Sequence, residues 1–151
     1  MKIPFYLLLF KTFGAQKRAV RPEMQRLGLS PGQPKILDFL AGTDGCIQKD
    51  LANSCDIEPA TVSKLLDNME ASGLIVRKEK AGDRRSVLIT LTDAGKAAQQ
   101  AMERCFAGVE RKALEGFDKH ESEAFYSYLR RAYINLSGKE PDWKRGEHHA
   151  E

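Results

Sequence analysis

The sequence predicts a mainly α-helical protein with one small β-hairpin, an α+β fold. Apolar residues recur at helical spacing over most of the chain. One predicted helix face, for instance, carries Val62, Leu65, Leu66 and Met69. Between residues 74 and 92 the apolar period changes to two, as in strands, on either side of a short turn that contains glycine. A length of 151 residues suits a single domain.

The composition indicates a water-soluble globular protein. Charged residues make up 30% of the chain and hydrophobic residues 42%, proportions that fit neither a membrane protein nor a disordered chain. The formal net charge of +3 is only mildly basic. The position of the charges, rather than their sum, must therefore indicate the partner.

The N-terminal apolar stretch and the cysteines bear on location. Residues 5–10 form a run shorter than the hydrophobic region of a secretory signal, roughly 7–15 residues, and far shorter than the ~20 needed to span a bilayer. We therefore expect a helix buried against protein and no membrane partner.

Cys46, Cys55 and Cys105 include no CxxC pair, which argues against a disulfide framework and a zinc site. Reduced thiols in the cytoplasm, with no metal and no cofactor, are the expectation.

The N-terminal half is predicted to form four helices, over about residues 5–27, 31–41, 47–55 and 59–72. The first contains Pro22, which removes a donor and crowds the preceding turn, so a disturbance is expected there. Ser30 and Gln33 have the spacing of a capping box at the start of the second. The fourth has Pro59 near its start and Gly73 just past its end, as helices prefer.

The C-terminal half is predicted to contain a hairpin and two long helices, with strands over 74–80 and 86–92, a tip over 81–85, and helices over about 93–114 and 119–137. Thr92 is placed to cap the first of these helices. Asp118 and Glu121 form a capping box at the start of the second. Residues 138–151 are polar and lack periodicity, so a loose polar tail is expected.

Residues 48–66 have the spacing of a helix-turn-helix. Ala52 supplies the small side chain that a tight helix crossing needs, and apolar residues such as Leu51 and Val62 fill the angle between the helices. At the turn, Asp56 stands where glycine is commoner, and aspartate is one of the few residues that enter the left-handed region at modest cost. Many pairs of amphipathic helices would match part of this pattern, so the helix pair alone does not identify a function.

The hairpin that follows carries a local excess of positive charge. Five basic and two acidic residues lie between Arg77 and Arg85, a net charge of +3 that equals the charge of the whole chain. Such a run is most often a solvated face. Here it projects beside a candidate recognition helix, and a basic wing can reach the DNA backbone or minor groove while that helix enters the major groove.

The chain resembles the winged helix-turn-helix of the multiple antibiotic resistance regulator (MarR) family over residues 50–96, DLANSCDIEPATVSKLLDNMEASGLIVRKEKAGDRRSVLITLTDAGK. The segments NMEASGLIVR and LTDAG, with Asp83 and Arg85 in the wing, carry the resemblance. The order of helices before and after them matches over about residues 5–137.

This resemblance implies a single domain over residues 1–137, with a winged helix-turn-helix over about 30–92 and a helical dimerisation domain built from N- and C-terminal helices, about 3–27 and 93–137. It implies a homodimer that binds a palindromic operator in double-stranded DNA, as a repressor of transcription. In many members of the family a small phenolic or aromatic ligand relieves the repression.

The family motif, transferred residue by residue, places the recognition surface on the fourth helix. Short hydroxyl side chains at Thr61 and Ser63 can donate or accept at either base edge and let the helix approach closely. Lys64 stands where arginine is common, which weakens the case for a bidentate contact to guanine.

In the wing, Asp83 is expected to pair with Arg85 and hold the shape of the tip, which leaves Arg84 to reach the minor groove. The full set of expected DNA-binding residues is Ala60, Thr61, Ser63, Lys64, Asn68, Arg77, Lys80, Asp83, Arg84 and Arg85.

Two other functions fit parts of the sequence. A winged helix can bind another protein without binding DNA, although the basic tip argues against that. A regulator can also sense oxidation through a cysteine, for which Cys46 is the first candidate because it borders a turn, whereas Cys55 and Cys105 suit packing. The aromatic residues of the first and last helices suit core and dimer packing, with a ligand pocket between the helical and winged parts as the alternative. No arrangement of side chains predicts an enzyme.

Overall fold

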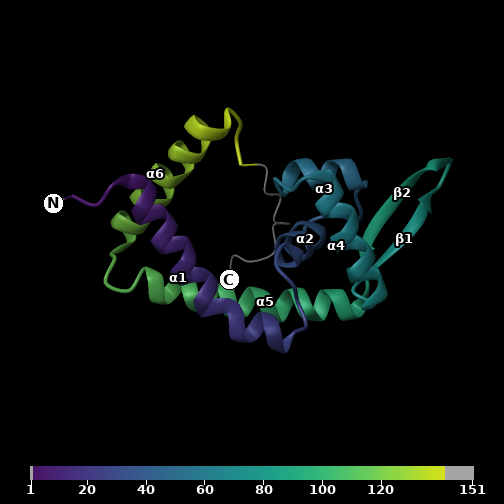
Figure 1. The fold of residues 1–151 in the computed structure, drawn as a ribbon, viewed down its shortest axis with the longest axis horizontal. Coiled ribbons are helices and arrows are strands. Elements are labelled where there is room, and N and C mark those ends of the chain that lie inside the picture. The colour runs from purple at the N-terminus through teal and green to yellow at the C-terminus, as the bar shows by residue number, and fades with distance from the viewer. Residues whose placement is uncertain (1, 142–151) are drawn as a thin grey trace.

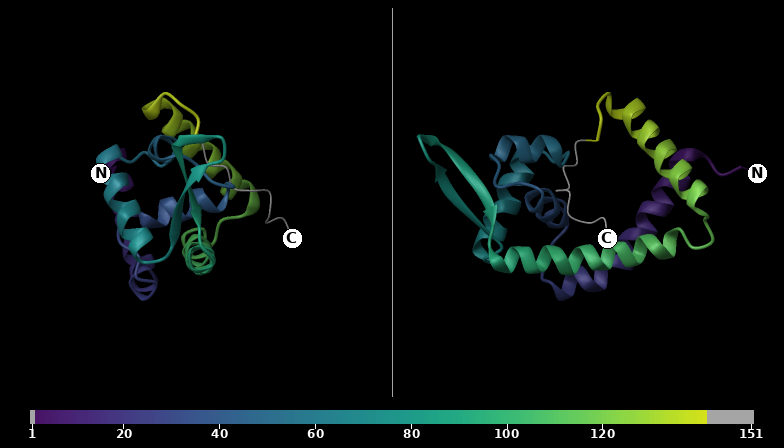
Figure 2. Two further views of the ribbon diagram at one scale, coloured as in Figure 1. Left: turned by 90° about the vertical axis from the view of Figure 1, so that its right-hand side faces the viewer. Right: turned by 180° about the vertical axis from the view of Figure 1, so that it is seen from behind.

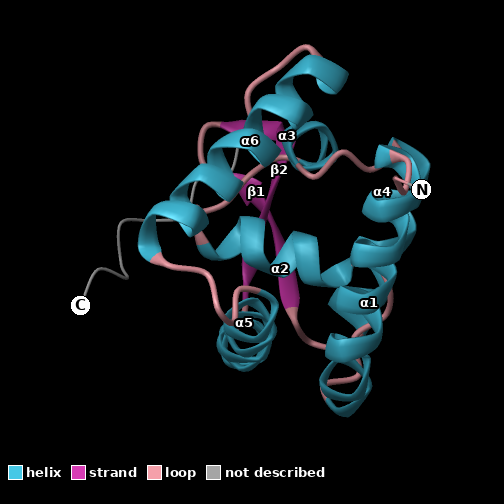
Figure 3. Ribbon diagram, turned by 90° about the vertical axis from the view of Figure 1, so that its left-hand side faces the viewer, coloured by secondary structure: helices cyan, strands magenta, loops and turns pink. Residues whose placement is uncertain are grey.

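The structure is a computed structural model that describes residues 2–141, with the side chains of Lys80, Arg84 and Arg85 left out of the description. Its elements are α1 (Phe5–Arg26), α2 (Gln33–Ala41), α3 (Gln48–Ser54), α4 (Pro59–Ala71), β1 (Ile75–Lys80), β2 (Asp83–Leu91), α5 (Asp93–Ala113) and α6 (Lys119–Ser137). Figure 3 shows a single small hairpin among helices, which confirms the predicted α+β class. No helix within residues 2–141 is long and apolar enough to cross a membrane.

The elements form a compact winged unit, made of α2, α3, α4 and the hairpin, and a long arm, made of α1, α5 and α6 (Figure 1). α2, α3, α4 and the hairpin gather at one end of α5, and the hairpin is the outermost element. α1 packs along α5, and α6 folds back from the far end of α5 (Figure 2). The winged unit therefore lies at one end of α1 and α5, and its hairpin points away from these two helices.

The hydrophobic core lies in the winged unit and the adjoining part of α5. Its fully buried side chains include Ile36, Leu37, Leu51, Val62, Leu66, Met69, Ile75 and Ile89. Each of these large apolar side chains contributes roughly 1.5–3 kcal/mol through burial. α6, in contrast, contains no buried residue, and only Val20 and Met24 of α1 are buried. The outer half of the arm therefore has little core of its own within one chain.

The helix ends follow the sequence signals with one exception. Thr92 Oγ1 accepts a hydrogen bond from Gly95 N at 3.0 Å, and the capping box of Asp118 and Glu121 is present, as predicted. α1 continues through Pro22 as one helix over Phe5–Arg26, so the disturbance expected at this proline does not divide the helix. The predicted start of α2 at residue 31 is wrong: the helix begins at Gln33.

The start of α2 is displaced by a tight turn. Gly32 takes φ = 92°, a left-handed conformation, where the helix would otherwise have begun. The predicted capping box is half formed: Gln33 Oε1 accepts from Ser30 N at 3.0 Å, but α2 has no side-chain cap from the Ser30 hydroxyl. Glycine suits this turn because other residues rarely adopt a φ of 92°, and an added Cβ would also lie 2.9 Å from Cδ1 of Leu65, whose side chain would have to shift.

The hairpin is longer than predicted and its tip is shorter. β2 begins at Asp83, so Arg84 and Arg85 belong to the strand, and the connection is Ala81 and Gly82, the latter at φ = 84°. A two-residue connection with glycine at positive φ lets pairing begin at once. The pairs Glu79 with Val87 and Lys80 with Asp83 place residues 84–86 in a bulge with no counterpart on β1.

Candidate nucleic-acid interface

The turn between α3 and α4 sets the angle of the candidate recognition helix. Asp56 has φ = 52°, which confirms the predicted left-handed position. On either side of it, Cys55 N donates to Leu51 O at 3.0 Å and Ile57 N donates to Ala52 O at 3.1 Å. These bonds satisfy the last carbonyls of α3 and redirect the chain into α4.

α4 buries one face and presents the opposite one to solvent. Val62, Leu65, Leu66 and Met69 are buried in the core, as the helical spacing predicted. Ala60, Thr61, Lys64 and Asn68 are exposed and Ser63 is half-buried. The predicted recognition residues thus share one accessible face, whose N-terminal part carries only small side chains and a lysine. A face of this kind can lie close to base edges and phosphates.

Arg77 joins the wing to the recognition helix. Its Nη1 lies 2.8 Å from Asp67 Oδ1 and 3.9 Å from Glu70 Oε1, both on α4, and its side chain is only 25% exposed. The pair fixes the base of β1 against α4 and offsets two carboxylates that would repel phosphates. The sequence does not predict Asp67 as the partner of Arg77, because the contact depends on the packing of β1 beside α4. Contact of Arg77 with DNA stays a prediction.

The wing is held by further bonds at its base and near its tip. Cys46 and Ile89 exchange two backbone hydrogen bonds, of 3.2 and 2.9 Å, so the segment before α3 pairs with β2. Thr92 Oγ1 donates to Gly73 O at 2.5 Å, which closes the hairpin base against the end of α4. Near the tip, Ser86 Oγ donates to Asp83 Oδ2 at 2.6 Å, a contact that the sequence did not reveal.

Three predicted DNA contacts fall outside the described side chains. Lys80, Arg84 and Arg85 are placed on the hairpin by its backbone alone. The predicted pair of Asp83 with Arg85, and the choice of Arg84 as the residue that reaches the minor groove, therefore stay predictions. The hairpin that carries all three projects beyond α4 (Figure 1).

The cysteines have the environment of packing residues. Burial is the first cause that raises the pKa of Cys46 and of Cys55 to about 11, with nearby Asp50 adding to the effect at Cys46. Cys55 Sγ also donates to Lys35 O at 3.8 Å. Cys105 is half-buried on α5, and burial raises its pKa as well. Thiols in this state are poor nucleophiles at neutral pH.

Native-state alkylation is expected to spare the two buried cysteines. With a pKa of about 11, roughly one molecule in a thousand carries the Cys46 or Cys55 thiolate at pH 8. N-ethylmaleimide at pH 8 should therefore modify Cys105 first, and mass spectrometry of the digested protein locates the adduct. Rapid modification of Cys46 in the folded protein would contradict this and would favour oxidation sensing.

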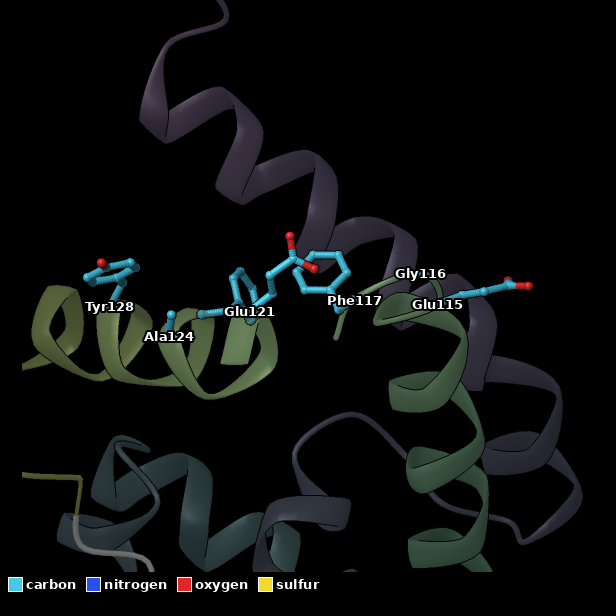
Figure 4. Close-up of a pocket in the computed structure, with 7 residues that line it drawn as sticks. Glu115, Gly116, Phe117, Glu121, Ala124 and Tyr128 are labelled. Atoms are coloured by element: carbon cyan, nitrogen blue, oxygen red, sulfur yellow. The ribbon is translucent and has the colours of Figure 1, made fainter. Parts of the chain in front are cut away.

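A cavity of about 440 Å³ lies at the turn between α5 and α6 (Figure 4). Its lining consists of Glu115, Gly116, Phe117, Glu121, Ala124, Phe125 and Tyr128. The rings of Phe117 and Phe125 meet edge to face with centroids 6.0 Å apart. The cavity is at the end of α5 remote from the winged unit, whereas the sequence suggested a pocket between the two parts (Figure 1).

A tight helix-turn-helix, an exposed recognition face and a basic hairpin fastened to it define a winged-helix DNA-binding protein. The MarR family model matches residues 27–86 of the chain. The chain belongs to this family of transcription regulators, which confirms the resemblance seen in its sequence.

Solved structures and a curated relative agree with this assignment. The transcriptional regulator PA3341 is 32% identical, with a TM-score of 0.78 over 90% of this chain and 100% of the other. The complex of Staphylococcus aureus MepR with DNA has a TM-score of 0.78 at 25% identity, over 89% of this chain and 99% of that one. The transcriptional repressor YetL of Bacillus subtilis is 27% identical over 138 residues, 89% of this chain and 82% of YetL.

Proposed function

We propose that this regulator is a homodimeric repressor that binds a palindromic operator in double-stranded DNA. The observation that carries the proposal is the exposed face of α4, which presents Thr61, Ser63 and Lys64 beside a basic wing. Asp67 and Glu70, two carboxylates of the same helix, lie within ion-pair distance of Arg77. MepR binds DNA in its solved complex and YetL is named a repressor, which supports both the partner and the sign of regulation.

The dimer is proposed from the apolar surface of the arm. α6 has no buried residue in one chain, although it spans 19 residues. Large apolar side chains that are exposed on α1 and α6 include Phe5, Tyr6, Leu8, Phe10, Phe13, Tyr128, Leu129 and Leu136. A monomer rarely exposes so many large apolar side chains on neighbouring elements, and a second copy would cover them. The arms then form the dimerisation domain, about residues 3–27 and 93–137.

The proposed DNA-binding residues act in two ways. Ala60, Thr61, Ser63 and Lys64 meet base edges and phosphates in the major groove, with Asn68 farther along the same face. Lys80, Arg84 and Arg85 of the wing bind the flanking backbone or minor groove. Asp83 shapes the wing. A small aromatic or phenolic ligand is proposed as the effector on the strength of the family resemblance.

A gel-shift titration tests the repressor proposal. Selection of bound DNA from a random pool should yield a palindrome whose half-sites lie about one helical turn, ~34–36 Å, apart. The purified chain should bind that palindrome in a complex that weakens steeply with salt, since phosphate contacts release counterions. Sedimentation equilibrium should give a dimer before DNA is added. A chain that stays monomeric and selects no sequence would favour the alternative of a protein-interaction module.

A further inference from the structure

The carboxylate of Asp56, in the turn of the helix-turn-helix, is bound by the far end of α6. Tyr133 donates its hydroxyl to Asp56 Oδ2 at 3.0 Å. Lys139 Nζ lies 2.8 Å from Asp56 Oδ1 and donates to Asn53 O, near the end of α3, at 3.3 Å. The partners are 77 to 86 residues apart in the chain. Both carboxylate oxygens of Asp56, a residue of the helix-turn-helix, are thus bound by residues at the end of the arm.

The segment after α6 is folded so that Lys139 points at this turn. Gly138 ends the helix at φ = 72°, and Lys139 N donates to Ser137 Oγ at 3.3 Å. Glu140 then pairs with Arg130 of α6 at 2.6 Å. The expected loose tail is therefore held at its first residues, while residues 142–151 lie outside the described part. These contacts keep the ammonium group of Lys139 close to Asp56.

The contact is a second attachment between the winged unit and the arm. The first is along α5, where α2 packs against it and Gln99 Nε2 donates to Asp38 Oδ1 at 3.3 Å. Figure 1 shows α5 along one side of the winged unit and the end of α6 turning toward α3 on the other. A unit held along one side can rock about that side. A unit held on two opposite sides keeps a fixed angle.

We propose that Tyr133 and Lys139 are positioning residues for DNA binding, which act through Asp56 to hold each winged unit at a fixed angle to the dimerisation arm. That angle sets the separation of the two recognition helices, and so the half-site spacing that the dimer accepts. The inference rests on the proposed dimer and operator. The side chains of the ion pair are both half-exposed, so the pair contributes little to folding, and we expect variants that lack it to fold.

The Asp56 carboxylate stays charged at neutral pH. The hydrogen bond from Lys139 is the first cause that lowers the pKa of Asp56, and the Tyr133 hydroxyl adds to it. Asp56 also has a backbone conformation that asparagine shares with aspartate at modest cost. Asp56→Asn therefore removes the charge without removing the turn.

The test compares operators of different spacing. Binding of Lys139→Met is measured to the selected operator, to versions with one base pair inserted or deleted between half-sites, and to an isolated half-site. The variant should bind the selected operator about fivefold more weakly, a difference of about 1 kcal/mol. Its affinity should depend less on the spacing between half-sites, while its affinity for the isolated half-site should match that of the control variant, Lys119→Met. Tyr133→Phe and Asp56→Asn should reduce the dependence on spacing too, and Lys139→Arg should restore it.

The matched control is Lys119→Met. It removes the same charge at the start of α6, the helix that Lys139 follows, where Lys119 Nζ lies 3.9 Å from Glu123 Oε1 and the Lys119 side chain is 91% exposed. A Lys139→Met variant that keeps the wild-type spacing preference, with an affinity equal to that of the control, would overturn the positioning role while leaving the repressor proposal intact. A wild-type dimer that selects no operator would overturn both.

A second measurement does not depend on DNA. Spin labels at position 68, introduced as Asn68→Cys with Cys105→Ser, report the distance between recognition helices in the free dimer. Lys139→Met should broaden that distance distribution, and Lys119→Met should not. An unchanged distribution in Lys139→Met would count against the positioning role even where DNA affinity falls.

Discussion

Replacing Gly95 with alanine should destabilise the folded protein by about 3 kcal/mol or more. A Cβ at this position would lie 2.0 Å from the carbonyl oxygen of Leu74 and 3.2 Å from Cδ2 of Leu91. The Leu74 oxygen cannot move away freely, because it accepts the backbone N–H of Thr92 at 3.1 Å. Helix propensity alone predicts the opposite sign, a gain of about 1 kcal/mol for alanine in α5. Steric overlap with backbone is the larger effect.

Urea unfolding at fixed protein concentration measures this difference. Gly108→Ala is the matched control, since it lies in the same helix and its added Cβ would meet only Arg111 Nη2, at 3.7 Å. The control should be as stable as the wild type or up to ~1 kcal/mol more stable. A Gly95→Ala variant with the stability of the control would show that the close approach of α5 to Leu74 is absent in solution.

Reversing the charge of Lys64 should weaken operator binding by about a hundredfold or more. Lys64 is exposed on the recognition face of α4, and glutamate there would place a carboxylate against phosphates in both half-sites. Like charges brought together in an interface cost several kcal/mol. The slope of log affinity against log salt should also fall by about two, one phosphate contact for each protomer. Fluorescence anisotropy over a salt series measures both quantities.

Lys112→Glu supplies the control for Lys64→Glu. It makes the same change of charge in the last turn of α5, at the end of the arm remote from α4 (Figure 1). Its effect on affinity should be small and its salt slope close to that of the wild type. If both variants lost affinity equally, the effect would come from net charge and α4 would lose its assignment as the recognition helix.

Local signals in the sequence predicted much of the fold. Thr92 and the pair Asp118 and Glu121 cap their helices as expected, because capping depends on residues three positions apart. The left-handed turn at Asp56 was also predicted from its position between two amphipathic helices. Each of these features is determined within one or two helical turns, so a short window of sequence contains the cause.

Features that depend on distant contacts were predicted less well. α2 begins after the left-handed turn at Gly32, and the capping pattern of Ser30 and Gln33 does not reveal that turn. The hairpin tip was placed over the charged residues, whereas the strands pair up to the Ala81–Gly82 connection. The contacts of Asp56 with Tyr133 and Lys139 require the whole arm to fold back, and no periodicity predicts them.

In the candidate site, too, features set by local sequence were predicted, and those set by distant contacts were not. The exposed face of α4 follows from helical spacing, and Ala60, Thr61, Lys64 and Asn68 lie on it as expected. The contact of Arg77 with DNA is predicted from its charge and stays a prediction, whereas its partner within the protein is not predicted. Only the packing of β1 beside α4 reveals that Asp67 lies 2.8 Å away.

The bulge and the Cys46 bridge in the hairpin also bear on how the protein avoids aggregation. An isolated two-stranded hairpin exposes unpaired backbone groups that can template the strands of another molecule. Here the chain around Cys46 pairs with Ile89, and residues 84–86 interrupt the ladder near the tip. Residues 77–80 of β1 are all charged in the sequence. The edges of the hairpin are thus guarded against pairing with strands of another molecule, which fits the proposal that the chain self-associates through the apolar arm.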